Sequence, residues 1–191
     1  LKAGEIAMRA QIGRWTSGVY EGESCLDDDG RGHEEITARA RVTVANGEAE
    51  VDLSASDDQL PSIVNSSYAN TCACVNVAFM YLSEDKILNE GSTRPIRIVT
   101  RKGSICDPYP PAPVVGSTSI VATIIIEAAL KALANVAPNE VIAGYARRFR
   151  FVVAGRDRDN RTYIWHHFAN RGGAGASRDH DGWTNVGSIT S

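Results

Sequence analysis

The clearest hydrophobic pattern in the chain is a strict alternation between residues 36 and 44. Apolar side chains at every second position are separated by threonine and arginine, which is typical of a strand with one buried and one solvated face. Asn46-Gly47 follows, a dipeptide favoured in two-residue turns, and residues 48–53 resume the alternation. The pattern therefore predicts a β-hairpin.

Shorter runs of the same kind predict further strands. They comprise residues 18–26, a second hairpin formed by 95–100 and 104–106 about Lys102-Gly103, and a third pair formed by 145–154 and 161–169. The segment 54–67 is rich in serine, aspartate and asparagine, which indicates a surface connection. The proline-rich residues 108–113 predict a stiff spacer.

Helical spacing of apolar residues appears in three stretches, 1–14, 68–84 and 120–136. Ser66 or Ser67 is placed to cap the second stretch. The third is apolar around most of its girth but is too short and too charged to span a bilayer, so it predicts a buried core helix. We therefore expect an α+β fold in which two β-hairpins pack on the helices 68–84 and 120–136.

Composition narrows the class of protein. The chain has 191 residues, 43% of them hydrophobic and 23% charged, which favours a folded chain and a single region spanning 1–191. A net charge of −3 gives no reason to expect nucleic acid or an anionic membrane as a partner. The opening mixes charged residues into a helical pattern, unlike a signal peptide, and begins without Met, so we expect a portion of a longer chain.

The four cysteines lack a CxxC spacing and are few for a disulfide scaffold, which predicts a reducing, cytoplasmic setting. Cys72 and Cys74 lie two apart on a predicted helix and point to different faces, so we expect small core residues rather than ligands of one metal.

The turn Asn89-Glu90-Gly91, followed by Arg94-Pro95, is the strongest candidate for ligand contact. Gly91 is expected at positive φ, and Pro95 is expected to hold Arg94 extended. An amide, an acid and a guanidinium on one turn suit a carboxylate or imide-like ligand, with Glu90 steadying Arg94. The alternative is that Arg94 satisfies a carbonyl or closes a surface ion pair.

Two further groups contain residue types that bind ions. His166 and His167 with Asp179, His180 and Asp181 are metal-ligand types, although adjacent strand residues face opposite sides, so at most one of the two histidines shares a site. The alternative is a solvated strand end. The loop of Gly172, Gly173 and Gly175 is a candidate for a phosphate cradle, although it matches neither common phosphate-binding motif.

The run Asp27-Asp28-Asp29-Gly30 invites a calcium interpretation, but the spacing of an EF-hand is absent, and an acidic solvated turn is favoured. No GxSxG elbow or Ser–His–Asp ordering indicates a nucleophilic hydrolase. Catalytic residues are therefore not identified from motifs.

Several of these motifs together resemble a known family. They are Gly18-Val19-Tyr20-Glu21 leading into Asp27-Asp28-Asp29-Gly30, the hairpin, Val64-Asn65, Asn89-Glu90-Gly91 with Arg94-Pro95-Ile96, residues 103–113, and Gly172-Gly173-Ala174-Gly175-Ala176 before Asp181-Gly182. In order and spacing the chain resembles an internal portion of the hydantoinase B/oxoprolinase family, the B-type subunits of ATP-dependent hydantoinases, 5-oxoprolinases and related acetone and acetophenone carboxylases.

The resemblance implies part of a subunit that opens cyclic amides of the hydantoin, 5-oxoproline or lactam type and that is not active alone. It implies a hydantoinase A type partner that handles ATP and Mg, contact with the remaining segments of the B-type subunit, and a small-molecule substrate. The implied substrate-binding residues are Asn65, Asn89, Glu90 and Arg94.

The sequence also departs from the family's usual pattern. Thr118, Ile120 and Ile124 stand where the family usually has polar residues, and Phe168 and Asn170 stand where an acid is frequent. The apolar residues Ile120 and Ile124 motivate one alternative, a portion of an ATP-dependent ketone carboxylase. Another alternative is a structural fragment with no activity of its own, which docks to the remaining segments or to an A-type partner.

Overall fold

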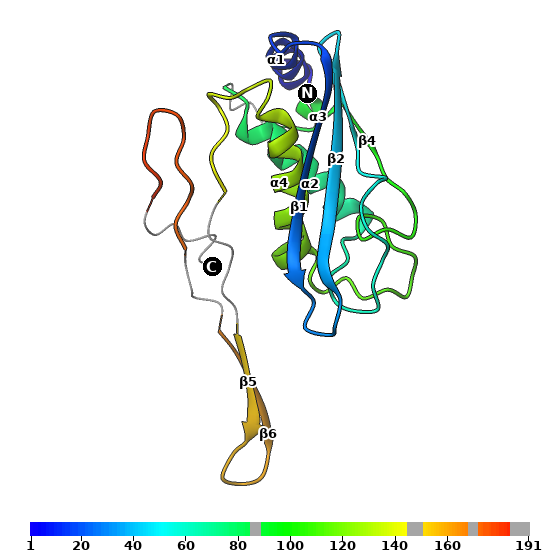
Figure 1. The fold of residues 1–191 in the computed structure, drawn as a ribbon, viewed down its shortest axis with the longest axis vertical. Helices are drawn as coiled ribbons and strands as arrows, with labels where there is room; N and C mark the ends of the chain where they lie inside the picture. Colours follow the sequence, from blue (N-terminus) through cyan, green and yellow to red (C-terminus); the bar gives the residue numbers. More distant parts are fainter. Residues whose placement is uncertain (85–88, 145–150, 168–171, 184–191) are drawn as a thin grey trace. The chain divides into compact units, whose positions relative to one another are not determined.

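The computed structural model describes residues 1–84, 89–144, 151–167 and 172–183, without the side chains of 151–152 and 166–167. The chain divides into two compact units, Leu1–Val141 and Ile142–Ser191. The first carries a four-stranded sheet with its helices, and the second carries a two-stranded hairpin (Figure 1). The expected α+β class is confirmed.

The sheet of the first unit has the order β1-β2-β3-β4. Strands β1 (Gly18–Asp28), β2 (Glu34–Ala45) and β3 (Glu48–Asp52) are antiparallel. Asn46 and Gly47 join β2 to β3 at φ values of 54° and 73°, the left-handed pair that a tight two-residue hairpin turn requires. The first predicted hairpin is thus confirmed.

The second predicted hairpin is wrong. Strand β4 (Ile96–Val99) pairs in parallel with β3. Within residues 104–106 only Ser104 takes part in isolated bridges, with Asp58 and Asp107, so this segment is not a partner strand. Gly103 does turn the chain, at φ 84°, but its carbonyl accepts from Gln59 N at 2.8 Å. The chain reaches β4 only after the helix α2 (Tyr68–Tyr81), and such a long crossover permits parallel pairing.

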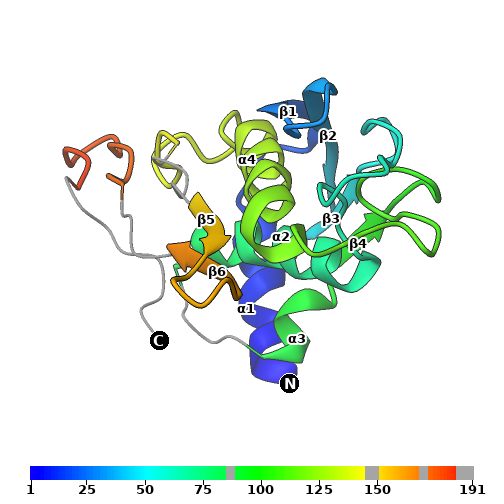
Figure 2. The ribbon, with the colours of Figure 1, turned by 90° about the horizontal axis from the view of Figure 1, so that it is seen from below.

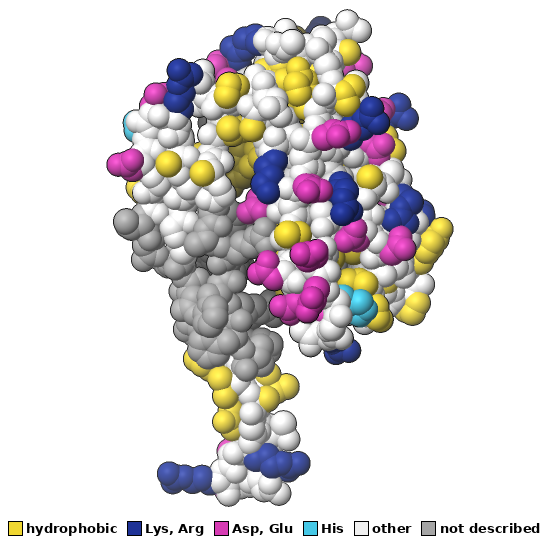
Figure 3. Space-filling model, in the orientation of Figure 1, with side chains coloured by type: hydrophobic (Ala, Val, Ile, Leu, Met, Phe, Trp, Pro, Cys, Tyr) yellow, Lys and Arg dark blue, Asp and Glu magenta, His cyan; other side chains and the backbone are white. Residues whose placement is uncertain are grey.

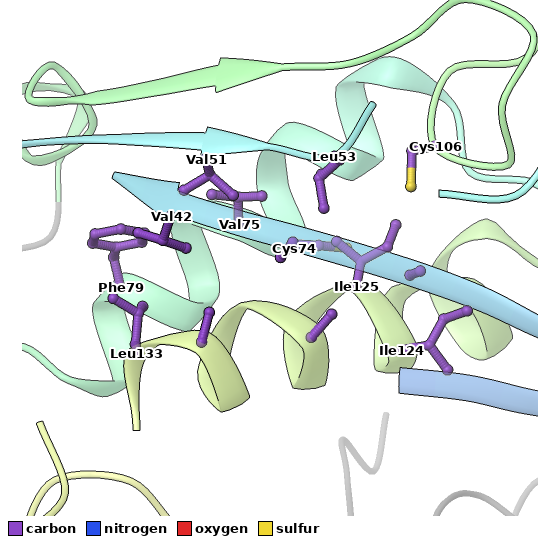
Figure 4. Close-up of a cluster of buried hydrophobic side chains, with 14 of the residues drawn as sticks. Val42, Val51, Leu53, Cys74, Val75, Phe79, Cys106, Ile124, Ile125 and Leu133 are labelled. Atoms are coloured by element: carbon purple, nitrogen blue, oxygen red, sulfur yellow. The ribbon is translucent and has the colours of Figure 1, made fainter. Parts of the chain in front are cut away.

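The helices α1 (Lys2–Gly13), α2 and α4 (Ala122–Leu133) confirm the three predicted stretches, and Ser67 caps α2. A π-helical turn, η1 (Ser117–Val121), leads into α4. Side chains from α2 and α4 meet the sheet in one core (Figure 4). It includes Val42, Val51, Leu53, Val75, Phe79, Ile124, Ile125 and Leu133, each essentially without solvent exposure. The buried helix expected at 120–136 is therefore confirmed for α4.

The packing of α4 against β1 depends on Gly22. A Cβ at this position would collide with the carbonyl oxygen of Ala128 and the amide nitrogen of Ala132, so the helix backbone lies directly against the strand. Nearby, Ser24 Oγ donates to Glu127 Oε2 at 2.6 Å and Lys131 Nζ donates to the Glu23 carbonyl at 2.9 Å. The two charged side chains of α4, Glu127 and Lys131, thus both contact residues of β1.

The opposite charges of β1 and β2 interleave on the surface (Figure 3). Arg39 illustrates this, because its guanidinium lies 2.6 Å from Asp57 and 3.5 Å from Glu23. These pairs are exposed, and each contributes little to stability.

The prediction that the segment 54–67 lies on the surface is wrong for several of its residues. Ser56, Ser62, Val64 and Asn65 are buried. The buried hydroxyl of Ser56 has a partner other than water, because the Arg39 amide donates to Ser56 Oγ at 3.0 Å.

The cysteines behave as small core residues where they are buried. Burial raises the pKa of Cys74 to about 12 and that of Cys106 to about 11, so both thiols stay protonated. Cys72 is half-buried and Cys25 is exposed.

In the second unit, β5 (Phe151–Arg156) and β6 (Thr162–His167) form the third predicted strand pair, with Val153 opposite Trp165. The predicted first half of β5, residues 145–150, lies outside the described residues.

Candidate functional site

The predicted ligand-binding turn folds as a single helical turn, α3 (Glu90–Thr93), which lies beside α1 (Figure 2). Asn89 caps it, accepting from Gly91 N at 2.8 Å. The expected positive φ of Gly91 is wrong, because Gly91 is absent from the positive-φ glycines of the described chain. Glycine is required there for space instead: a Cβ would collide with the carbonyl oxygen of Leu1.

Arg94 is helical, at φ −60° and ψ −38°, and not extended as expected. It closes α3 by donating its backbone N–H to the Gly91 carbonyl at 3.2 Å, and this bond outweighs the extended preference imposed by Pro95. Its Nη1 donates to Glu5 Oε2 at 3.1 Å, so the acid that holds the guanidinium is Glu5 from α1 and not Glu90.

Glu5 belongs to a chain of ion pairs. Its second oxygen lies 3.2 Å from Arg9 Nε, and Arg9 Nη1 lies 2.7 Å from Glu48 Oε1 at the start of β3. Hydrogen bonds from Arg94 and then Arg9 lower the pKa of Glu5, and those to Glu48 and Glu5 raise the pKa of Arg9. Two acids and two bases thus link α3, α1 and β3 with no net charge.

Arg9 also lines a cavity of about 520 Å³ between the end of α1 and the β2–β3 turn. The lining residues are Arg9, Ala10, Ile12, Gly13, Trp15, Ser17, Val44, Asn46 and Gly47. Trp15 is only 7% exposed, and its Nε1 has no hydrogen-bond partner within the described chain. The ion pairs and the cavity together form the site that we call the α1 site, which joins Arg94 to Trp15 through Glu5 and Arg9.

Sequence patterns did not single out this cavity. Glu5 and Arg9 are four residues apart on a predicted helix, a spacing that signals an ion pair. Glu48, Asn46 and Trp15 come to the same place only because the hairpin turn packs against α1.

Asn65 lies apart from the α1 site, since none of its hydrogen bonds reaches α1 or α3. Its Oδ1 accepts from Leu60 N, and its Nδ2 donates to the carbonyls of Leu60, Ser62 and Pro113, all at 2.9 Å. The side chain is fully buried and ties residues 60–65 to the proline-rich segment. A role in substrate binding stays a prediction.

The glycine loop packs against its own unit. A Cβ at Gly175 would collide with the carbonyl oxygens of Ala143 and Gly144. The Ala143 amide donates to the Ala176 carbonyl and the Ala174 amide to the Trp183 carbonyl, each at 2.9 Å. Gly172 and Gly173 are half-buried. Phosphate binding by this loop therefore stays a prediction.

The metal candidates lie partly outside the described side chains, so a metal site here stays a prediction. Asp179 and Asp181 are exposed, and the side chains of His166 and His167 lie outside the description. Within the described ranges, no group of three or more His, Cys, Asp or Glu residues is arranged to hold a metal ion.

Asp27 and Asp28 end β1, and the carboxylates of Asp28 and Asp29 stabilise the turn that follows toward β2. Asp29 accepts from the amides of Arg31 at 2.8 Å and His33 at 3.1 Å, and its second oxygen lies 2.7 Å from His33 Nδ1. Burial raises the pKa of Asp29, but these bonds and the Ser62 hydroxyl outweigh it and hold the pKa well below its usual range.

The sequence matches the hydantoinase B/oxoprolinase family over residues 1–191. The chain belongs to this family. It is 30% identical to the beta subunit of the caprolactamase of Pseudomonas jessenii, over 95% of this chain and 32% of that relative. It is also 28% identical to the B subunit of a putative D-/L-hydantoinase of Pseudomonas sp. (strain NS671), over 82% of this chain and 28% of that relative.

The solved structure of one of these relatives agrees with this assignment. The ATP-dependent caprolactamase of Pseudomonas jessenii superposes with a TM-score of 0.84 at 29% identity, over 97% of this chain and 33% of that one. A nucleotide-free acetone carboxylase has a TM-score of 0.77 at 16% identity, over 94% of this chain and 26% of that one, which shows a shared fold. The chain thus spans about a third of the length of the curated relatives that it matches.

No helix in the described part of the chain is long and apolar enough to cross a membrane.

Proposed function

We propose that this chain is part of the B-type subunit of an ATP-dependent amidohydrolase that opens cyclic amides of the hydantoin, 5-oxoproline or lactam type. The observation that carries the proposal is its 30% identity to a caprolactamase subunit across nearly its whole length. The named relatives are subunits of larger enzymes, which supports a partner subunit. In this proposal an A-type partner handles ATP and Mg, and the remaining segments of the B-type subunit complete the enzyme.

The second candidate is a portion of an ATP-dependent ketone carboxylase. The fold shared with acetone carboxylase favours it. The apolar residue Ile124 does not support the carboxylase alternative. Its side chain is fully buried in the core and is not available to line an open site. Ile120 is half-buried in η1, just before α4.

The direct test follows ATP turnover by the complete complex with an A-type subunit. We expect turnover that depends on hydantoin, 5-oxoproline or caprolactam and is absent with acetophenone. Turnover with acetophenone alone would favour the carboxylase, and no turnover with any of them would favour a structural fragment.

Arg94 provides a residue-level prediction within this proposal. Its side chain is 50% exposed and uses Nη1 on Glu5, so the rest of its planar fork remains available to a ligand oxygen. In the complete complex, we expect Arg94→Lys to lower kcat/KM about tenfold, because lysine keeps the charge and loses the fork. The midpoint of denaturant unfolding should barely move, since an exposed ion pair contributes about 1 kcal/mol or less.

The opposite pattern would exclude Arg94 from ligand contact. A lysine variant that keeps full turnover but unfolds at a clearly lower denaturant concentration would mean that Arg94 only braces α3 against α1.

A further inference from the structure

We propose that the outer edge of β1 binds a strand of a partner polypeptide that carries lysine or arginine at alternate positions. This strand lies beside Val19, Glu21 and Glu23 and extends the sheet. Such binding concerns the assembly of the protein and does not depend on the reaction assigned above.

Strand β1 ends the sheet on one side, because the strand order is β1-β2-β3-β4 (Figure 1). It is 11 residues long, and its pairing with β2 is continuous from Gly18 to Leu26. An edge strand presents backbone N–H and C=O groups that the sheet itself does not satisfy, and proteins often blunt such edges with proline or a bulge. Residues 18–26 contain neither device. This edge is therefore a template on which a further strand can pair.

The β2–β3 turn settles which residues of β1 face this edge. In a two-residue hairpin the residues that flank the turn, here Ala45 and Glu48, exchange both backbone hydrogen bonds. Such pairs alternate along antiparallel strands, so even-numbered residues of β2 direct their backbone groups to β1, where even-numbered residues receive them. The N–H and C=O groups of Val19, Glu21 and Glu23 therefore point away from β2, to the outer edge.

The contacts of these three residues agree with this geometry. Lys131 Nζ donates to the Glu23 carbonyl at 2.9 Å, in the place of an N–H from a neighbouring strand. Apart from this bond, the edge-facing backbone groups of Val19, Glu21 and Glu23 have no hydrogen-bond partner within the described part of the chain. Val19 is 49% exposed, and the side chains of Glu21 and Glu23 are 76% and 70% exposed. The edge is thus both unpaired and open to solvent.

The charges on the outer face of the sheet specify the chemistry of the added strand. Acidic and basic side chains alternate in sign from each strand to the next (Figure 3). The opposed pairs are Glu21 with Arg41 at 3.9 Å, Glu23 with Arg39 at 3.5 Å, and Glu50 with Arg97 at 2.9 Å. Opposite charges directly across a sheet stabilise it, and like charges destabilise it. Because β1 contributes the acids, a basic strand continues the series.

The same charges argue against a second copy of this chain as the occupant. Two β1 edges paired over residues 19–23 would place one Glu21 opposite another, which destabilises a sheet. Acidic side chains on an edge discourage acidic strands and so select the partner by its charge. The named relatives are beta and B subunits, which supports a strand from another polypeptide.

The test follows amide hydrogen exchange by NMR in the isotopically labelled 191-residue chain. The probe is a short end-blocked peptide of alternating lysine and valine. When about nine-tenths of the chain is bound, exchange of the Glu21 and Glu23 amides should slow about tenfold, because only the free fraction exchanges. The amides of Tyr20 and Gly22 face β2 and serve as internal controls, whose exchange should not change.

Replacing Glu21 and Glu23 together by glutamine removes the charges and keeps the side-chain shape. The affinity for the lysine peptide should fall about tenfold, the combined loss of two cross-strand charge pairs. Glu50→Gln is the matched control, because Glu50 lies on β3 inside the sheet, and this variant should bind as the parent does. Unchanged exchange at Tyr20 and Gly22 shows that each variant is folded.

Equal binding of a glutamate–valine peptide would overturn the proposal, because charge would then not select the strand. Equal binding of a lysine peptide with N-methylated backbone amides would also overturn it, since no strand could then be added. Slow exchange of the Glu21 amide without peptide would mean that the edge is already paired, and a dependence on protein concentration would identify a second copy as the occupant. The measurement needs neither ATP nor a substrate, so its failure leaves the proposed function in place.

Discussion

Replacing Gly22 by alanine should lower the free energy of unfolding by about 3 kcal/mol, at the upper end of what overpacking a core costs. The added Cβ would collide with backbone atoms of Ala128 and Ala132. Because these belong to the helix backbone, no side chain can rotate away, and α4 has to move off β1 as a whole. Denaturant unfolding followed by circular dichroism measures the effect.

Gly13→Ala is the matched control. Nothing lies within 4 Å of a Cβ built on Gly13, and the residue ends α1 without a positive φ. Alanine should therefore leave the midpoint unchanged or raise the stability by up to about 1 kcal/mol. Equal midpoints for the two variants would mean that α4 does not lie directly on β1.

Replacing Asn65 by alanine should cost about 3 kcal/mol, because one amide group serves four backbone partners in a site without solvent. The Leu60 amide and three carbonyls would lose their partner at once. We expect a lower unfolding midpoint and faster proteolysis near Pro113, whose carbonyl accepts a hydrogen bond from Asn65.

Asn65→Asp separates the donors of this amide from its acceptor. Aspartate can still accept from Leu60 N but offers no hydrogen to the three carbonyls and brings a buried charge, so it should destabilise at least as much as alanine. If both variants unfold like the parent protein, the amide does not hold the loop, and a ligand role for Asn65 gains weight.

Sequence patterns predicted those helices and strands whose conformation depends on neighbouring residues. The alternation at 36–44 and Asn46-Gly47 were sufficient for the first hairpin, because side-chain period and turn dihedrals are properties of neighbouring residues. Helices α1, α2 and α4 followed from their spacing for the same reason. The proposed second hairpin failed because Lys102-Gly103 specifies a turn without specifying which strand β4 will meet.

The sequence by itself determined the family, the main helices and the first hairpin, since motif order and periodicity are written along the chain. Only the tertiary structure decided the partner of Arg94, the burial of Asn65 and the cavity beside Trp15. Each of these depends on contacts between residues far apart in sequence, such as Glu5 with Arg94 and Asn65 with Pro113. Such contacts are set by how helices and strands pack, and no local pattern encodes them.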